Sequence, residues 1–289
     1  AGVSALRGLR NAHPYVAAGH QNGEVRVWRV SMDSGSSISS AVLRGHSAAV
    51  TCMLWVDVPY QKTATTPGRV HVHLGPDSPI TEGVHNVGFG LDSLPRGLRL
   101  VTASLDRTVR VWNPRASAPT HTLVGHAGGV TCMQVHPGLG LLATGSQDCN
   151  IKLWDLKTLR TGRALSPDPS AKPKPNANAN AVQSLATLSG HRGSVVTLTV
   201  TNENLEPVPQ SPPAPLAPNQ APQAAAGALL FSGGEDGCLK EWALTLTPDC
   251  GEPLKSHYGH TKGLTAAVTA ESGKLVTASW DGTVRDWSR

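Results

Sequence analysis

One short pattern of residues occurs four times in this chain and constrains its fold more than any other feature. In each copy a Gly-His pair is followed by a Ser or Thr, an Asp four positions later, and a Trp six positions after the Asp. The spacing from the hydroxyl residue to the Trp never changes, whereas the segment after the His is short from His260 to Thr277 and long from His46 to Thr102. Such a pattern indicates a repeat array. The four copies are His46, Thr102, Asp106 and Trp112; His126, Thr144, Asp148 and Trp154; His191, Ser232, Asp236 and Trp242; and His260, Thr277, Asp281 and Trp287.

Each copy contains the strands of a small antiparallel sheet. Residues 130–135 form an alternating run, with Val130 and Cys132 expected on one face. Further strands are expected at 141–146, at 151–154 after a tight turn, and at 184–188. Four strands of this length cannot bury both faces alone, so the copies are expected to stack and share a core. The sequence therefore predicts an all-β fold, and specifically a β-propeller.

The four residue types of each copy can form one hydrogen-bonded set, which we call the tetrad. The Trp indole N–H can donate to the hydroxyl, the hydroxyl can bond one nitrogen of the His ring, and the other nitrogen can donate to the Asp. All members are expected to be buried and paired. We interpret the tetrads as structural.

The Gly-His pairs at 45, 125, 190 and 259 and the segments VRVW, IKLW, LKEW and VRDW resemble the WD40-repeat family. Only Trp154-Asp155 carries the literal Trp-Asp dipeptide, which is a mild departure from the family pattern. The resemblance implies a propeller of WD40 blades that acts as a non-catalytic scaffold for partner proteins or peptides.

A fifth, degenerate copy opens the chain, with Ala18 at the hydroxyl position and Asn22 at the Asp position. About five blades are expected, and the last lacks its outer strand. Since the family usually closes with seven blades, we expect this chain to be a segment of a seven-bladed ring. The predicted blades are residues 1–46, 47–124, 125–188, 189–256 and 257–289.

Three inserts interrupt the repeats at residues 57–97, 158–183 and 202–227. The second and third are rich in Pro, Ala, Asn and Gln, so flexible linkers are expected. By alternation of antiparallel strands, all three emerge on the face opposite the Asp turns. The face with the Asp turns is therefore the better candidate for a docking surface.

Composition sets broad limits on the function. The 289 residues are 39% hydrophobic and contain no apolar run long enough to cross a membrane, so no membrane contact is expected. Five cysteines scattered through the repeats favour an intracellular location, cytoplasmic or nuclear. The net charge of +5 is spread along the chain rather than clustered, which makes nucleic-acid binding an unfavoured alternative.

Two enzymatic interpretations were weighed. Recurring Ser, His and Asp residues suggest a hydrolase, but four identical copies, mostly with Thr, are not four active sites. The first insert contains His71, His73, Asp77 and His85, which could form a zinc set, although a solvated loop is favoured. We therefore expect no enzyme activity, catalytic residue, cofactor or metal.

In the family that the sequence resembles, partner contacts come from the residue before the turn Asp and from the start of the first strand. The first set is Leu105, Gln147, Glu235 and Trp280, and the second is Thr51, Thr131, Val196 and Thr265. Trp280 is the strongest candidate, because a Trp beside a turn, on a face whose other residues are small and neutral, is typical of a binding hot spot. The absence of Arg from these positions disfavours phosphopeptide recognition.

An alternative function rests on residues 142–157. This stretch resembles the box by which some WD40 proteins dock the adaptor of cullin ubiquitin ligases, with Asp155 and Lys157 as the candidate adaptor contacts. The chain would then be a substrate receptor of such a ligase.

Overall fold

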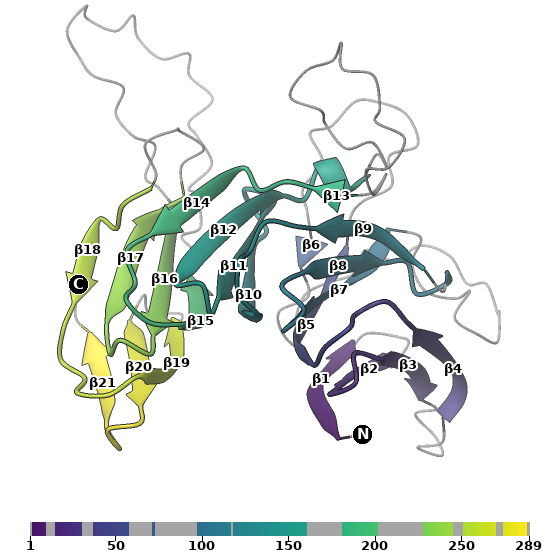
Figure 1. Ribbon diagram of the computed structural model, residues 1–289, viewed down its shortest axis with the longest axis horizontal. Coiled ribbons are helices and arrows are strands. Elements are labelled where there is room, and N and C mark those ends of the chain that lie inside the picture. The colour runs from purple at the N-terminus through teal and green to yellow at the C-terminus, as the bar shows by residue number, and fades with distance from the viewer. Residues whose placement is uncertain are drawn as a thin grey trace, which may run out of the picture.

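The computed structural model describes residues 2–9, 15–30, 37–57, 71–72, 97–116, 118–160, 181–201, 228–244, 251–269 and 274–287. Within these ranges the chain forms five β-sheets, which follow one another around an arc with the first and last sheets at its two ends (Figure 1). The prediction of an all-β propeller fold is confirmed. We call the sheets blades 1 to 5.

The strands of each blade follow in chain order from the inside of the arc outward. Blade 1 contains β1 (Val3–Leu9), β2 (Tyr15–His20), β3 (Val25–Val30) and β4 (Ser37–Leu43), and blade 2 contains β5 (Val50–Asp57), β7 (Leu98–Ser104), β8 (Val109–Trp112) and β9 (Pro119–Leu123). Blade 3 contains β10 (Val130–His136), β11 (Leu141–Ser146), β12 (Asn150–Asp155) and β14 (Ala186–Ser189), and blade 4 contains β15 (Val195–Val200), β16 (Leu229–Gly234), β17 (Leu239–Ala243) and β18 (Lys255–His257). Blade 5 contains β19 (Leu264–Thr269), β20 (Leu275–Ser279) and β21 (Val284–Trp287).

Every blade begins with a β-bulge that simple alternation does not predict. In blade 3 the register of β10 against β11 shifts between Val130 and Cys132. Val130 therefore joins Met133 in the core shared with blade 2, whereas Cys132 packs against the core shared with blade 4. The prediction that Val130 and Cys132 share one face was wrong, because the bulge inserts one extra residue, Thr131. The same shift occurs at Val3/Ala5, Val50/Cys52, Val195/Thr197 and Leu264/Ala266.

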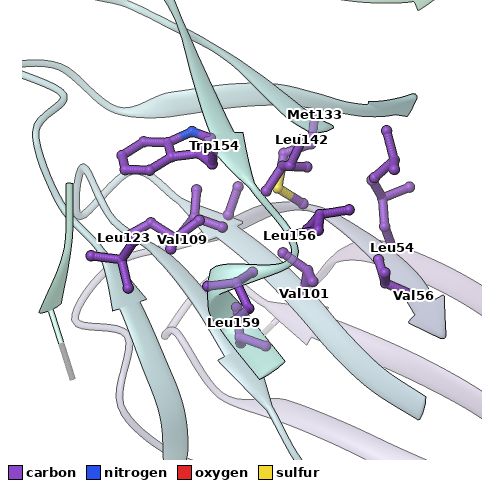
Figure 2. Packing of buried hydrophobic residues seen from close by; sticks show 14 of the residues in the cluster. Leu54, Val56, Val101, Val109, Leu123, Met133, Leu142, Trp154, Leu156 and Leu159 are labelled. Carbon is purple, nitrogen blue, oxygen red and sulfur yellow. The ribbon is translucent and has the colours of Figure 1, made fainter. Parts of the chain in front are cut away.

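The hydrophobic core is divided among the junctions between neighbouring blades. Figure 2 shows the junction of blades 2 and 3, where Leu54 and Val101 from one blade pack with Leu142 and Trp154 from the other. Corresponding clusters join blades 1 and 2, blades 3 and 4, and blades 4 and 5. Each blade thus buries the face that meets a neighbouring blade, as the sequence predicts for sheets that cannot fold alone.

Parts of the predicted flexible inserts are ordered, which corrects that prediction at these positions. Thr158–Arg160 forms a 3₁₀ turn (η2), and Leu159 is buried in the core of blades 2 and 3. β13 (Ala181–Val182) pairs in parallel with β9 at the outer edge of blade 2. Leu159 and Val182 are the apolar side chains of these pieces that the core accepts.

In the first insert, Asp57 completes β5, and β6 (His71–Val72) pairs with the end of that strand. These residues also form strands instead of a flexible segment. Residues 58–70, 73–96, 161–180 and 202–227 of the inserts lie outside the described residues.

Candidate functional site

The tetrads form as a hydrogen-bonded chain in four blades. In blade 3, His126 Nδ1 lies 2.9 Å from Asp148 Oδ2, and His126 Nε2 lies 2.8 Å from Thr144 Oγ1. The Trp154 indole donates to the same Thr144 oxygen at 2.9 Å. In blades 2, 4 and 5 the corresponding distances are 2.7 to 3.0 Å. In each of these blades the sequence pattern thus brings together the segment before the first strand, the second and third strands, and the turn between them.

One arrangement of hydrogens satisfies every member. The Nδ1–H of a neutral His donates to the Asp carboxylate, and Nε2 accepts from the hydroxyl, which accepts from the indole. In blade 3 the carboxylate of Asp148 also accepts the backbone N–H groups of Ala127 at 2.8 Å and Asn150 at 3.0 Å. Asp148 therefore ties the turn after β11 to the segment before β10.

The protonation equilibria follow from this geometry. Burial alone would raise the pKa of Asp236, but hydrogen bonds from His191 and from the Arg192 backbone lower it to about 2. The pKa of Asp148 is lowered against burial in the same way, by His126 and Ala127. Burial lowers the pKa of His126. In blade 3 the native state thus favours an ionised Asp148 beside a neutral His126.

The same geometry leaves no hydrolytic centre in the tetrads. The hydroxyls of Thr102, Thr144 and Ser232 are fully buried and lie between a His nitrogen and a Trp indole. A nucleophile must reach its substrate, and these oxygens meet neither solvent nor a cleft. We therefore interpret the tetrads as the frame that holds the turns.

Blade 5 departs from the expectation of a fully buried tetrad, and blade 1 has no tetrad, as its sequence predicts. In blade 5, Trp287 is only half-buried, because this sheet has three strands within the described residues, whereas the side chain of His260 is fully buried. Blade 1 has Ala18 and Asn22 at the tetrad positions. Asn22 Oδ1 accepts only the nearby Glu24 backbone N–H, at 3.1 Å, among the hydrogen bonds of the described residues.

The residues before the turn Asp form a row on the face that carries the turns. In each blade the backbone N–H of this residue donates to a carbonyl just before the first strand, at 2.9 to 3.0 Å: Leu105 to Ala49, Gln147 to Gly129, Glu235 to Ser194 and Trp280 to Gly263. The side chains of all four residues are exposed, Trp280 to 74%. The tetrads thus hold a row of exposed side chains in fixed positions.

The strand-start residues serve another purpose. Thr51 Oγ1 donates to the carbonyl of Val130 at 2.7 Å, and Thr131 Oγ1 donates to the carbonyl of Val195. Val196 packs against the core between blades 4 and 5, whereas Thr265 is exposed. Thr51 and Thr131 therefore join neighbouring blades, which the family pattern of partner contacts did not predict.

Sequence reasoning also missed the small residues beneath the row. Ala49, Gly129, Ser194 and Gly263 each stand three positions after the tetrad His. A Cβ at Gly129 would lie 2.7 Å from Leu105 Cδ2, so a larger residue would collide with the preceding blade. The recurrence of a small residue at this position was the available sequence signal.

The remaining candidates lie apart from the row. Asp155 ends β12, and its Oδ1 accepts the backbone N–H of Lys157 at 2.7 Å. This bond gives Asp155 a role in shaping the turn. Only the backbone of His71 is described, and His73, Asp77 and His85 lie outside the described residues.

The described ranges hold no group of three or more His, Cys, Asp or Glu side chains placed to bind a metal ion. The four cysteines described there, Cys52, Cys132, Cys149 and Cys238, are free thiols. A search of the same ranges found no helix with the length and hydrophobicity needed to span a membrane.

The stacked antiparallel sheets and their tetrads define a β-propeller protein. The family model "WD domain, G-beta repeat" matches residues 81–113, 117–155 and 251–285. The chain therefore carries WD40 repeats, as the resemblance implied.

Individual relatives match only part of the chain. A mitochondrial division protein 1 of Aspergillus terreus is 40% identical over 95 residues, which cover 32% of this chain and 14% of that protein. Nuclear distribution protein PAC1-1 of Uncinocarpus reesii is 45% identical over 65 residues, or 22% of this chain and 14% of that protein. The matches thus span about one seventh of these relatives' length.

Among solved structures, the WD40 β-propeller domain of Doa1 matches with a TM-score of 0.53 and 18% identity. The match covers 97% of this chain and 62% of that one. At this identity the likeness supports the fold alone.

Proposed function

We propose that the chain is a non-catalytic docking module, which binds partner proteins or peptides on the face that carries the Asp turns. The observation that carries the proposal is Trp280, a large aromatic side chain that is 74% exposed while its backbone is held to Gly263. Monomeric proteins seldom expose a Trp to this extent, and rigid exposed aromatics are typical of binding hot spots. Leu105, 41% exposed at the same position of blade 2, extends the apolar part of the row.

The scaffold supports this function physically. Because the turn of blade 5 is fixed by its tetrad, little conformational entropy is lost when a partner orders the Trp280 side chain. The WD40 relatives support the class of function, whereas the identity of the partner is a separate question.

The test is affinity capture of proteins from a cell extract with the immobilised chain. We expect Trp280→Ala to lose captured partners while its thermal unfolding stays unchanged. Leu254→Ala is the matched control, because Leu254 is 63% exposed but lies just before β18 at the outer edge of blade 4. Equal capture by Trp280→Ala and wild type, or a loss with Leu254→Ala alone, would contradict the proposal.

A further inference from the structure

Two turns of the row, which carry unlike exposed side chains, meet at one glycine. The Trp280 N–H donates to the Gly263 carbonyl at 3.0 Å, and a Cβ built on Gly263 would lie 3.0 Å from Glu235 Cα. Glu235 belongs to the turn of blade 4 and Trp280 to that of blade 5. Gly263 therefore joins the backbones of two neighbouring turns, one carrying Glu235 and the other Trp280, and places no side chain of its own between them.

The Glu235 carboxylate is oriented without being neutralised. Its Oε2 accepts a hydrogen bond from Ser194 Oγ at 2.6 Å. Two exposed basic residues flank these contacts in the sequence, Arg192 before Ser194 and Lys262 before Gly263, and among the described residues neither forms an ion pair with Glu235. A negative group is thus held on the turn next to the one that carries the exposed aromatic ring.

We infer that Glu235 and Trp280 form a site for a cationic side chain of the partner, with arginine preferred over lysine. A cation is attracted electrostatically both by the face of an indole ring and by a carboxylate, and both interactions are favourable at an exposed site. A guanidinium can stack on the ring while its N–H groups donate to the carboxylate, which an ammonium cannot do. The inference rests on the proposed function, because it names the chemistry recognised on the same face.

The test is a titration of the full chain, followed by NMR, with Nα-acetyl-arginine N-methylamide. The citrulline analogue is the matched neutral probe. The chain has seven Trp residues, and the Trp280→Phe variant assigns the Trp280 indole signal. We expect the arginine probe to shift this signal with about five- to tenfold higher affinity than the citrulline probe.

Glu235→Gln should remove this preference, whereas Glu252→Gln, which neutralises an exposed carboxylate outside the row, should keep it. The preference should also weaken with added salt. Equal affinity for the two probes, no shift of the Trp280 signal, or an unchanged preference in Glu235→Gln would overturn the inference.

Failure of this inference differs from failure of the docking function. If Trp280→Ala loses captured partners but arginine and citrulline bind alike, the docking face remains and the cation site is wrong. If the probes discriminate but no captured partner depends on Trp280, the cation site remains and the docking function is wrong.

Discussion

At the scale of single residues, the carboxylate of the tetrad Asp accepts the most hydrogen bonds of any tetrad member. Asp148 accepts a hydrogen bond from His126 and two from backbone N–H groups. Removing the carboxylate leaves these donors without their partner in a partly buried place.

We predict that Asp148→Ala lowers the free energy of unfolding by about 2 to 4 kcal/mol, measured by urea denaturation. The matched control is Asn22→Ala in blade 1, where the same turn position carries no tetrad and one exposed hydrogen bond. That change should cost less than about 1 kcal/mol. Similar losses in the two variants would show that the tetrad adds nothing to the turn.

Some residue-level features were predictable because they are local. The spacing of Thr144, Asp148 and Trp154 is set by a two-residue strand period and one tight turn, so the sequence predicted how the hairpin pairs them. The prediction from alternation was wrong at Val130, because a bulge depends on how two strands fit together. The one extra residue of the bulge cannot be recognised in a pattern of polar and apolar residues.

At the scale of elements, the bulge residues join one blade to the next. Ser4, Thr51 and Thr131 are the extra residues of their bulges, and each hydroxyl donates to the first residue of the following blade's inner strand. Blade 4 has Val196 at this position and uses apolar packing instead.

We predict that Thr131→Val lowers the free energy of unfolding by about 1 kcal/mol, because the Val195 carbonyl loses its donor while the side-chain volume is kept. Thr265→Val is the control, since Thr265 holds the same position in blade 5 but is exposed and has no side-chain hydrogen bond among the described residues. It should leave stability within about 0.5 kcal/mol of wild type. Chemical denaturation of both variants checks the difference, and equal effects would contradict the role given to the junction.

At the scale of the whole molecule, the two ends of the arc leave blade faces exposed. Val268 and Val284 of blade 5 are 58% and 70% exposed, whereas Ile151, which holds the position of Val284 in blade 3, is fully buried against blade 4. Exposed apolar faces of this kind favour further contacts. Closure into a seven-bladed ring stays a prediction.

The buried histidines and tetrad carboxylates also give the molecule a pH dependence. The pKa of His126, His121 and His136 is lowered by burial from 6.5, so below that pH the unfolded chain binds protons that the native state does not. The lowered pKa of Asp236 adds stability that is present above 3.8 and is lost as the pH falls toward about 2.

We therefore predict that the free energy of unfolding is greatest above pH 6.5 and falls in two stages, first below 6.5 and again below 3.8. Urea denaturation at a series of pH values checks this course. Asp236→Asn should reduce the change in the acidic stage. Stability that increases between pH 7 and pH 5 would contradict the assignment of neutral buried histidines.

The sequence by itself determined the all-β class, the repeated hairpins and the tetrads, because these depend on residues a few positions apart and on side chains that must be paired when buried. Only the tertiary structure decided that Thr131 bonds the next blade, that Leu159 and Val182 enter a core, and that the turns of Glu235 and Trp280 meet at Gly263. Those contacts join residues from different blades, and their distances depend on how the sheets stack, which no local pattern encodes.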